Sequence, residues 1–382
     1  MIYLDNAAST RIDDNVLDIM LPFFNKYYGN SNNITHKLGI EANKAVVHAR
    51  NNVANILGCL PQQIFWTSGS TESNNIAILG LISHLQTNQE ADFNIVTSAI
   101  EHRSVLHPIE SIKILGGKII ILEPELTGKI SVQQFESAIM DSTKIVCIMH
   151  VNNELGVINN IQAIGEICNS RGVYFHCDAT QAVGKVPVIL KELNVDSISI
   201  SAHKFHGPKG VGCLYIKDES LIKPTFYGGG QENGIRPGTL NVPGIVGLSE
   251  ALSLTIKRMD EDMPKIEKLR DKFESIIEAH DNRIIVNGKS EPRVANISNI
   301  SFPIRSGYSF LELITENGVI ACSSGSACDS ADNKPSHVMK ALGKSRHEAK
   351  NTLRFSLSKF TTDEEIEVAA YHILELFDKI KL

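Results

Sequence analysis

Lys204 is the residue of this sequence whose neighbours point most directly to chemistry. It lies in DSISISAHKFHGPKG (196–210), where an apolar strand candidate ends at Ser201 and a glycine-rich turn follows. A lysine partly removed from water has a lowered pKa, and the neutral amine can form an imine with an aldehyde cofactor. Ser201 and His203 could donate hydrogen bonds to a phosphate group of that cofactor. The competing interpretation is an exposed lysine on a turn, the usual setting of this residue.

Two further clusters follow strand candidates and suit a nitrogen heterocycle that carries a phosphate. Asp178, in YFHCDATQAVGK, can keep a ring nitrogen protonated, and Gln181 can hydrogen-bond a phenolic oxygen. Ser70 and Thr71, in FWTSGSTESNN, stand where a helix is expected to begin. Free N–H groups at a helix N-terminus bind phosphate. In both clusters an ordinary helix cap is the alternative.

Four more side chains extend this set. His102, in TSAIEHRSVLHP, could stack on a ring and move protons, although it is one of 13 histidines. Asn153 follows another strand candidate and could orient a phenolic oxygen or a substrate carboxylate, or simply form a turn. Thr239 lies in a stretch too rich in glycine for regular secondary structure, and it could donate to a phosphate. Arg354 offers the bidentate fork that recognises a carboxylate, with a structural salt bridge as the alternative.

Among seven cysteines, Cys328 has the setting of a reactive thiol. The number is odd and no pair has C-x-x-C spacing, so neither a disulfide framework nor a metal site is predicted. Most of the others lie in apolar stretches, which is typical of small buried side chains, and Cys322 follows the apolar run GVIA. Cys328 lies among small residues in ACSSGSACDSA (321–331), so we expect an exposed thiol that can act as a nucleophile. An incidental surface thiol is the alternative.

The scaffold for these residues is predicted by short apolar runs that alternate with helical patterns between about residues 60 and 220. Several of the runs are nearly continuous, as in strands covered on both faces, and helical stretches such as 161–171 lie between them. This alternation predicts a doubly wound α/β domain with a mostly parallel sheet. Ligands bind beyond the carboxyl ends of such strands, so clusters that follow strands are expected to share one site. The strand candidates are 64–67, 93–98, 118–122, 144–150, 173–177, 196–201 and 211–216.

A different pattern begins after about residue 250. Apolar residues at helical spacing predict one long amphipathic helix over 252–280. A strand candidate (295–302), a helix (308–316) and a terminal helix (about 363–381) follow. We therefore expect two domains: a large one, 15–255, and a small α+β one formed by 1–14 and 256–382.

Bulk properties exclude several classes of protein. The chain is 42% hydrophobic and 21% charged, as in ordinary globular proteins. A formal net charge of −6 at pH 7 argues against direct nucleic-acid binding. No apolar run reaches the roughly 20 residues of a membrane span, and no secretory signal is visible, so we expect a cytoplasmic protein without membrane contact.

Taken together, the motifs resemble those of the cysteine desulfurases, a branch of the class V aminotransferases with the fold-type I architecture. Nine segments occur in the order that this family shows, and they run through essentially the whole chain: YLDNAAST, TSGSTESNN, EHRSVL, MHVNNELGV, FHCDATQAVGK, SAHKFHGPKGVGCLY, GGGQENGIRPGT, SSGSACDSA and RFSLSKFTTDEEI. The resemblance implies pyridoxal 5'-phosphate bound covalently at Lys204, with Asp178 on the pyridine nitrogen and Gln181 on the phenolic oxygen. His102 would stack on the ring and assist proton transfer.

The resemblance also implies how phosphate, substrate and sulfur are handled. Thr239 would reach the phosphate from the other subunit of a homodimer, and Asn153 with Arg354 would bind the carboxylate of L-cysteine. Cys328 would accept the sulfur as a persulfide, and alanine would be released. The persulfide would then pass its sulfur to an acceptor protein. The remaining phosphate contacts would come from the polar residues at two strand ends: Ser70, Thr71, Ser201 and His203.

Several alternatives stay open. The loop GNSNNITH departs from the pattern of the better-known desulfurases, and the chain stops soon after its terminal helix. TSAIEHRSVLHP and GGGQENGIRPGTLNVP look closest to desulfurases of DNA phosphorothioation systems, while delivery to iron–sulfur clusters or to tRNA uses the same site. The rival functions are a selenocysteine lyase, another class V enzyme such as an aminotransferase, and a scaffold without catalysis.

Overall fold

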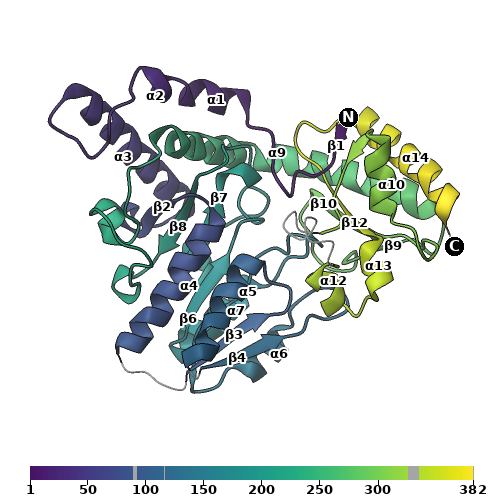
Figure 1. Ribbon diagram of the computed structural model, residues 1–382, viewed down its shortest axis with the longest axis horizontal. Helices are drawn as coiled ribbons and strands as arrows, with labels where there is room; N and C mark the ends of the chain where they lie inside the picture. The colour runs from purple at the N-terminus through teal and green to yellow at the C-terminus, as the bar shows by residue number, and fades with distance from the viewer. Residues whose placement is uncertain (89–92, 116, 326–334, 382) are drawn as a thin grey trace.

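The computed structural model describes residues 1–88, 93–115, 117–325 and 335–381, and the structural statements below refer to these. Two lobes lie side by side, with the N-terminus and the C-terminus both on the smaller one (Figure 1). The larger lobe is built on a seven-stranded sheet in the order β2-β8-β7-β6-β5-β3-β4. Its strands are β2 Ile64–Thr67, β3 Asn94–Ser98, β4 Lys118–Leu122, β5 Thr143–Cys147, β6 Tyr174–Asp178, β7 Ser197–Ser201 and β8 Gly212–Ile216.

The strand directions confirm the predicted architecture. Strands β4, β3, β5, β6 and β7 are parallel, and β8 is antiparallel to both of its neighbours. β2 and β4 have the bounds that the sequence predicted, and the other predicted strands overlap the observed ones. The fold is thus a doubly wound α/β fold with a mostly parallel sheet.

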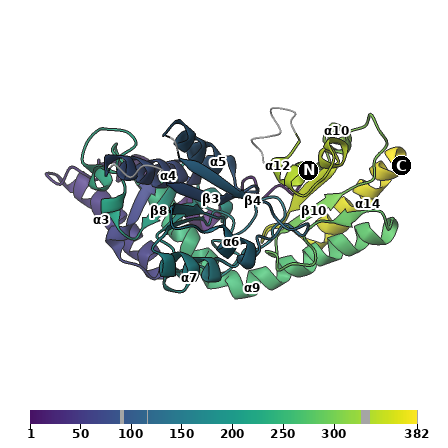
Figure 2. The ribbon, with the colours of Figure 1, turned by 90° about the horizontal axis from the view of Figure 1, so that it is seen from below.

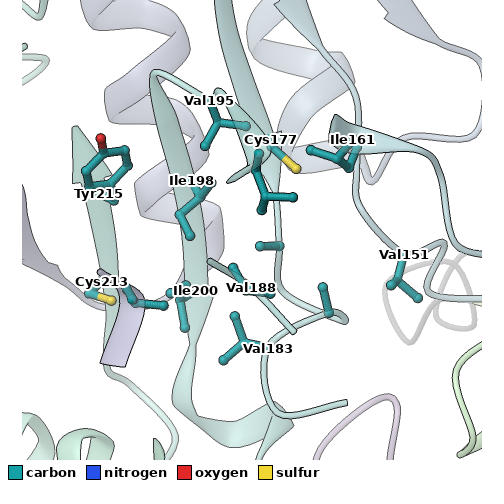
Figure 3. Packing of buried hydrophobic residues seen from close by; sticks show 14 of the residues in the cluster. Val151, Ile161, Cys177, Val183, Val188, Val195, Ile198, Ile200, Cys213 and Tyr215 are labelled. Atoms are coloured by element: carbon teal, nitrogen blue, oxygen red, sulfur yellow. The ribbon is translucent and has the colours of Figure 1, made fainter. Parts of the chain in front are cut away.

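Helices cover both faces of this sheet. Successive side chains of a strand point to opposite faces, so each face has its own apolar residues for the helices to cover. Ile64 and Trp66 of β2 belong to a core with α3 (Lys37–Leu57), α7 (Ile161–Arg171) and α9 (Val242–His280). Phe65 between them belongs to a second core with α4 (Ser70–Thr87) and α5 (Arg103–Glu110). Figure 3 shows Cys177 and Cys213 among aliphatic side chains of the first core, the packed setting expected for them.

The smaller lobe has its own core. β10 (Ile297–Ser301) pairs with β12 (Thr352–Ser356) and β9 (Ile285–Val286), and α10 (Phe310–Asn317) and α14 (Asp363–Ile380) pack on this sheet. The opening strand β1 (Ile2–Tyr3) joins this lobe by pairing with β11 (Ile320–Ala321). A group of phenylalanines fills the core: Phe273, Phe302, Phe310, Phe355 and Phe377.

Helix α9 runs beneath both lobes (Figure 2). The prediction that it starts at residue 252 was wrong, because the helix begins at Val242. The side chain of Asn241 accepts the N–H of Gly244, and Pro243 occupies the first turn, where its missing N–H costs nothing. The domain boundary that we propose, between 255 and 256, therefore falls within a continuous helix.

Short elements complete the described chain. None of the helices in the described ranges is long and apolar enough to cross a membrane. The short α-helices are α1 Asp14–Met20, α2 Pro22–Asn25, α6 Val132–Ala138, α8 Leu190–Leu193, α12 His337–Ala341 and α13 Arg346–Lys350. Single 3₁₀ turns span Pro61–Gln63, Ser111–Leu115, Ala202–Lys204, Glu219–Leu221 and Gln231–Gly234.

Candidate active site

A cavity of about 460 Å³ opens at the carboxyl ends of β2, β3, β5, β6 and β7. It is where ligands bind in open α/β sheets. Thr239 is exposed and is not among the residues that line this cavity, and Cys328 lies outside the described residues. The structure brings ten of the predicted residues together there: Ser70, Thr71, His102, Asn153, Asp178, Gln181, Ser201, His203, Lys204 and Arg354.

Lys204 ends the turn that follows β7. Its Nζ donates to the carbonyl oxygens of Ala7 and Ala8, both at 2.7 Å, so the N-terminal segment holds the amine from the smaller lobe's side. A second lysine lies behind it, and Nζ of Lys185 donates to the carbonyl oxygen of Lys204 at 3.3 Å. Burial, together with the charge of Lys204, lowers the pKa of Lys185 to about 7.

Asp178, the last residue of β6, is oriented by a buried chain of hydrogen bonds. Its Oδ1 accepts the N–H of Thr180 at 2.9 Å, and its Oδ2 accepts from the amide of Asn74 at 3.0 Å. Oδ1 of Asn74 lies 2.9 Å from Nε2 of His176, whose Nδ1 lies 2.8 Å from Oγ of Ser197. Burial lowers the pKa of His176 to about 4, so this ring is neutral at pH 7. Since an amide oxygen only accepts, Nε2 carries the proton, and the chain fixes the direction of the Asp178 carboxylate.

The turn between β2 and α4 has the shape of an anion seat. A Cβ atom on Gly212 would lie 2.7 Å from Cα of Gly69, and one on Gly69 would lie 3.3 Å from Oγ of Ser201. Only glycines allow this close approach of the two backbones. α4 begins at Ser70, and the first N–H groups of a helix have no acceptor inside it. The hydroxyl of Thr180 donates to Oγ of Ser70 at 2.6 Å.

The structure indicates where the proton of His102 lies and which charge His203 carries. His102 caps α5, and its Nδ1 accepts the N–H of Ser104 at 3.1 Å. The proton of the neutral His102 ring therefore lies on Nε2. Burial and the charge of Lys204 lower the pKa of His203 to about 3, so His203 contributes hydrogen bonds and no positive charge at neutral pH.

Arg354 of β12 reaches the cavity from the smaller lobe and is only 1% exposed. Its Nη1 donates to the carbonyl oxygen of Asn153 at 2.8 Å, and its Nη2 donates to Oδ1 of Asp5 at 2.9 Å. Within the described part of the chain, its Nε has no hydrogen-bond partner. The salt bridge considered as an alternative is thus present, and a guanidinium has five N–H donors, so groups remain for a carboxylate.

The sequence comparison and the structure comparison agree with this site. The profile of the class V aminotransferases matches residues 2–368. The chain belongs to this family. A relative named cysteine desulfurase IscS, from Methylobacillus flagellatus, is 42% identical over 368 residues, which cover 96% of this chain and 89% of the relative.

Two solved structures of this family have the same fold along nearly the whole chain. A NifS-like protein superposes with a TM-score of 0.90 at 36% identity and covers 99% of both chains. A structure described as SspA in complex with cysteine has a TM-score of 0.81 at 34% identity and covers 95% of this chain and 100% of the other. The cavity can therefore be compared with the needs of the family's cofactor.

Class V aminotransferases use pyridoxal 5'-phosphate, and the residues present fit this group. The glycine-lined turn before α4 leaves room for a phosphate, and Asp178 is a carboxylate with a fixed direction. Gln181 is buried, and its Oε1 has no hydrogen-bond partner among the described residues, while its Nε2 donates to the carbonyl oxygen of Ala7. A buried polar atom without a partner is expected where a ligand group completes the site.

Some residues of the site are not singled out by the sequence patterns. Asn74 lies one helical turn after Ser70, and that spacing was an available signal. Asp5 gives no local signal, because its partner Arg354 is 349 positions away along the chain. Lys185 lies in the motif FHCDATQAVGK, but only the fold shows that its amine contacts the backbone of Lys204.

Burial raises the pKa of every cysteine that the structure describes. Burial raises the pKa of Cys59 to about 11 and that of Cys168 and Cys322 to about 12. It raises the pKa of the buried thiols of Cys147, Cys177 and Cys213 as well. Because the thiolate is the nucleophile, none of these six is a good sulfur acceptor.

Proposed function

We propose that this chain is a pyridoxal-phosphate-dependent cysteine desulfurase, which converts L-cysteine to L-alanine and transfers the sulfur to Cys328 as a persulfide. The observation that carries the proposal is the single cavity that Lys204, Asp178 and Arg354 all line. The cavity brings together an amine that can bind an aldehyde, a carboxylate that can pair with a ring nitrogen, and a guanidinium that can bind a substrate carboxylate. The names of the relatives support the same reaction.

In this proposal the large lobe holds the cofactor. Lys204 would bind its aldehyde, Asp178 would pair with its ring nitrogen, and Gln181 would hydrogen-bond its phenolic oxygen. When bound, the cofactor supplies an electron sink for bonds to the α-carbon of the amino acid. His102 would stack on the ring of the bound cofactor, and its Nε2 and the amine of Lys204 would move protons. The phosphate is held by the helix N-terminus and neighbouring polar groups: Ser70, Thr71, Ser201 and His203.

The smaller lobe orients the substrate. Arg354 and Asn153 bind the carboxylate of L-cysteine, and their own contact at 2.8 Å keeps the two groups in one place. Asp5 accepts from the other terminal nitrogen of Arg354, so the guanidinium plane is fixed before the substrate arrives. A preorganised donor pair lowers the cost of ordering the substrate.

The sulfur step balances without an external oxidant. The Cβ–S bond of L-cysteine breaks, an S–S bond forms at Cys328, and the carbon fragment keeps the electron pair and gains a proton to become alanine. Cys328 is assigned this step because it lies in SSGSACDSA, a segment that resembles the one carrying the sulfur acceptor in cysteine desulfurases. Burial raises the pKa of the described cysteines, which agrees with this assignment. We propose the cytoplasm, where thiols are kept reduced, as the compartment of the reaction.

Product analysis tests this function against its rivals. The purified enzyme, loaded with cofactor, is given L-cysteine, and alanine is measured in the wild type and in Cys328→Ala. We expect alanine from the wild type and a loss of at least about a hundredfold in the variant. Turnover that needs a 2-oxo acid and survives in Cys328→Ala would identify an aminotransferase. A strong preference for selenocysteine would identify a selenocysteine lyase, and no bound cofactor at all would favour a scaffold.

A homodimer is part of the proposal. Thr239 is exposed and stands away from its own cavity, as expected for a residue that reaches the phosphate of a second copy. α1 to α3 carry exposed apolar side chains that a second copy could cover: Leu17, Leu21, Phe24, Tyr28, Ile34 and Val47.

The acceptor is proposed to be a protein with a cysteine thiol, because a persulfide passes its outer sulfur by thiol exchange. Three pathways offer such proteins: DNA phosphorothioation, iron–sulfur cluster assembly and tRNA thiolation. To identify the pathway, the persulfide form with labelled sulfur is incubated with one acceptor protein from each pathway. The acceptor that receives the labelled sulfur fastest identifies the pathway.

A further inference from the structure

Glu72 places a carboxylate beside the proposed phosphate site. Among the described residues that line the cavity, only Glu72 and Asp178 carry a carboxylate. Asp178 has a role in the proposed reaction, because it would pair with the ring nitrogen. Glu72 has none, and a carboxylate close to a phosphate repels it, since both groups are negatively charged. The contacts of Glu72 therefore indicate how the site tolerates this charge.

The side chain of Glu72 holds the turn that precedes α4. Glu72 stands in the first turn of the helix, and its Oε2 accepts the backbone N–H of Ser68. The N-cap of α4 is Gly69, so no side chain caps the helix from that position. The N–H groups of the first turn are thus left for a phosphate, while Glu72 fixes the chain just before them.

Arg236 compensates the charge of Glu72 through an ion pair. Its Nε donates to Oε1 of Glu72 at 3.1 Å, and its Nη2 donates to Oε2 at 3.3 Å. The side chains of Arg236 and Glu72 are only 21% and 18% exposed, so salt and water screen this pair less than a pair on the open surface. Arg236 is not among the residues that line the cavity. Its effect on a bound phosphate therefore passes through Glu72.

The segment around Arg236 is anchored to the large lobe. Ile235 packs in the same core as the apolar side chains of α4. The N–H of Gly238 donates to Oε1 of Gln231 at 3.0 Å, so the stretch 231–238 closes on itself. The guanidinium of Arg236 is thus presented to Glu72 from an ordered segment, which lowers the cost of forming the pair.

We propose that Arg236 is a positioning residue for the phosphate of the cofactor. By pairing with Glu72, it compensates the carboxylate that lies beside the phosphate, so that this carboxylate can hold Ser68 without repelling the ligand. The proposal rests on the function proposed above and deepens it, because it concerns only how the phosphate is bound. Binding of the ring and of the substrate carboxylate depends on other residues.

The test compares a ligand that has the phosphate with one that lacks it. The full chain, freed of cofactor, is titrated with pyridoxal 5'-phosphate and with pyridoxal, and both dissociation constants are measured by absorbance. The variants are Arg236→Gln, Glu72→Gln and the double variant that combines them. Lys129→Gln is the matched control, because Lys129 forms a half-buried ion pair with Glu291 at 3.1 Å and neither residue lines the cavity.

We expect Arg236→Gln to weaken binding of pyridoxal 5'-phosphate by about tenfold and binding of pyridoxal by less than about twofold, because only the phosphate meets the uncompensated carboxylate. The double variant should recover to within about threefold of the wild type, because its amide oxygen still accepts the N–H of Ser68 and no charge remains. Glu72→Gln alone keeps the cation of Arg236, so it should bind pyridoxal 5'-phosphate at least as tightly as the wild type. Lys129→Gln should bind both ligands as the wild type does.

Wild-type affinity for both ligands in Arg236→Gln would overturn the proposal, and equal losses for the two ligands would do the same by showing a role in stability alone. A double variant as weak as Arg236→Gln would assign the loss to displacement of Thr239 in the same segment, and would also overturn it. If Arg236→Gln does not fold, Glu72→Gln carries the test, and a loss confined to pyridoxal 5'-phosphate would contradict the proposal. All of these outcomes leave the proposed function intact, since that function fails only if the wild type makes no alanine from L-cysteine.

Discussion

At the scale of single residues, the Asp178 carboxylate accepts from two neutral donors in the described part of the chain, the side-chain amide of Asn74 and the backbone N–H of Thr180. Asn74 also accepts from His176 and donates to Oγ of Ser104, so its amide satisfies three buried groups at once. Removing a partner leaves each such group with the cost of burial but without its hydrogen bond. Asn74 and the backbone N–H of Thr180 together set the direction of the Asp178 carboxylate, and Asn74 is the only side chain of the two donors.

Asn74→Ala is therefore expected to lower the free energy of unfolding by about 1–3 kcal/mol and to weaken cofactor binding. Urea denaturation and cofactor titration measure the two effects. Asn75→Ala is the control, because Asn75 donates only to the carbonyl oxygen of Thr71 in its own helix and should change stability by less than about 0.5 kcal/mol. Equal effects of the two variants would contradict the role of Asn74.

Glu101 gives stability a dependence on pH. It is fully buried, and its Oε1 accepts from Ser98 and from the N–H of Met149, while its Oε2 has no hydrogen-bond partner among the described residues. Burial raises its pKa to about 8, and the nearby Asp178 acts in the same direction. A carboxyl whose folded pKa is raised stabilises the fold at low pH, and this contribution is lost as pH rises through the folded value.

We accordingly expect the wild type to lose stability relative to Glu101→Gln between about pH 5 and pH 8, by at most about 1.4 kcal/mol for each pH unit. The difference between the two free energies of unfolding, measured across this range, isolates the group. A difference that stays constant with pH would show that Glu101 is already ionised at pH 5 in the folded protein.

At the scale of elements, an ion pair fixes the segment that carries Thr239. Nη2 of Arg50, on α3, lies 2.6 Å from Oε1 of Glu232, which is nearly buried. Oε2 of Glu232 accepts the N–H of Trp66 at 2.7 Å, and Glu232 has φ +49°. A left-handed glutamate costs backbone energy, so the pair with Arg50 must offset that strain.

Arg50→Ala should thus lower the free energy of unfolding by about 3 kcal/mol, because it leaves a buried carboxylate unpaired. Lys44→Ala on the same helix removes an exposed ion pair with Glu41 and should change it by less than about 0.5 kcal/mol. Both values come from thermal or urea denaturation, and a similar small cost for both would show that Glu232 finds another partner.

The elements differ in how far the sequence could predict them. The strands of the main sheet were found because their apolar runs are nearly continuous and turn residues bound them. The first ten residues of α9 were missed, because the glycines before Val242 mask a cap that depends on Asn241 and Pro243. The contact of Arg354 with Asp5 could not be predicted, since it joins β12 to a residue just after β1, from opposite ends of the chain.

At the scale of the whole molecule, the apolar surface of α1 to α3 makes the proposed homodimer testable. Tyr28 on this surface and Tyr371 on α14 are similarly exposed, at 65% and 64%. Tyr28→Glu should shift the mass measured by light scattering toward that of one chain and weaken cofactor binding, because Thr239 of the second copy is lost. Tyr371→Glu should leave the mass unchanged. A dimer that survives Tyr28→Glu would place the interface on another face.

The most direct test of the account is the position of the transferred sulfur. The holoenzyme is incubated with L-cysteine without reductant, digested, and its cysteine peptides are analysed by mass spectrometry. The account predicts one added sulfur atom on the peptide with Cys328, in step with the alanine released. Sulfur on another cysteine, such as Cys322, or alanine release without any persulfide, would contradict it.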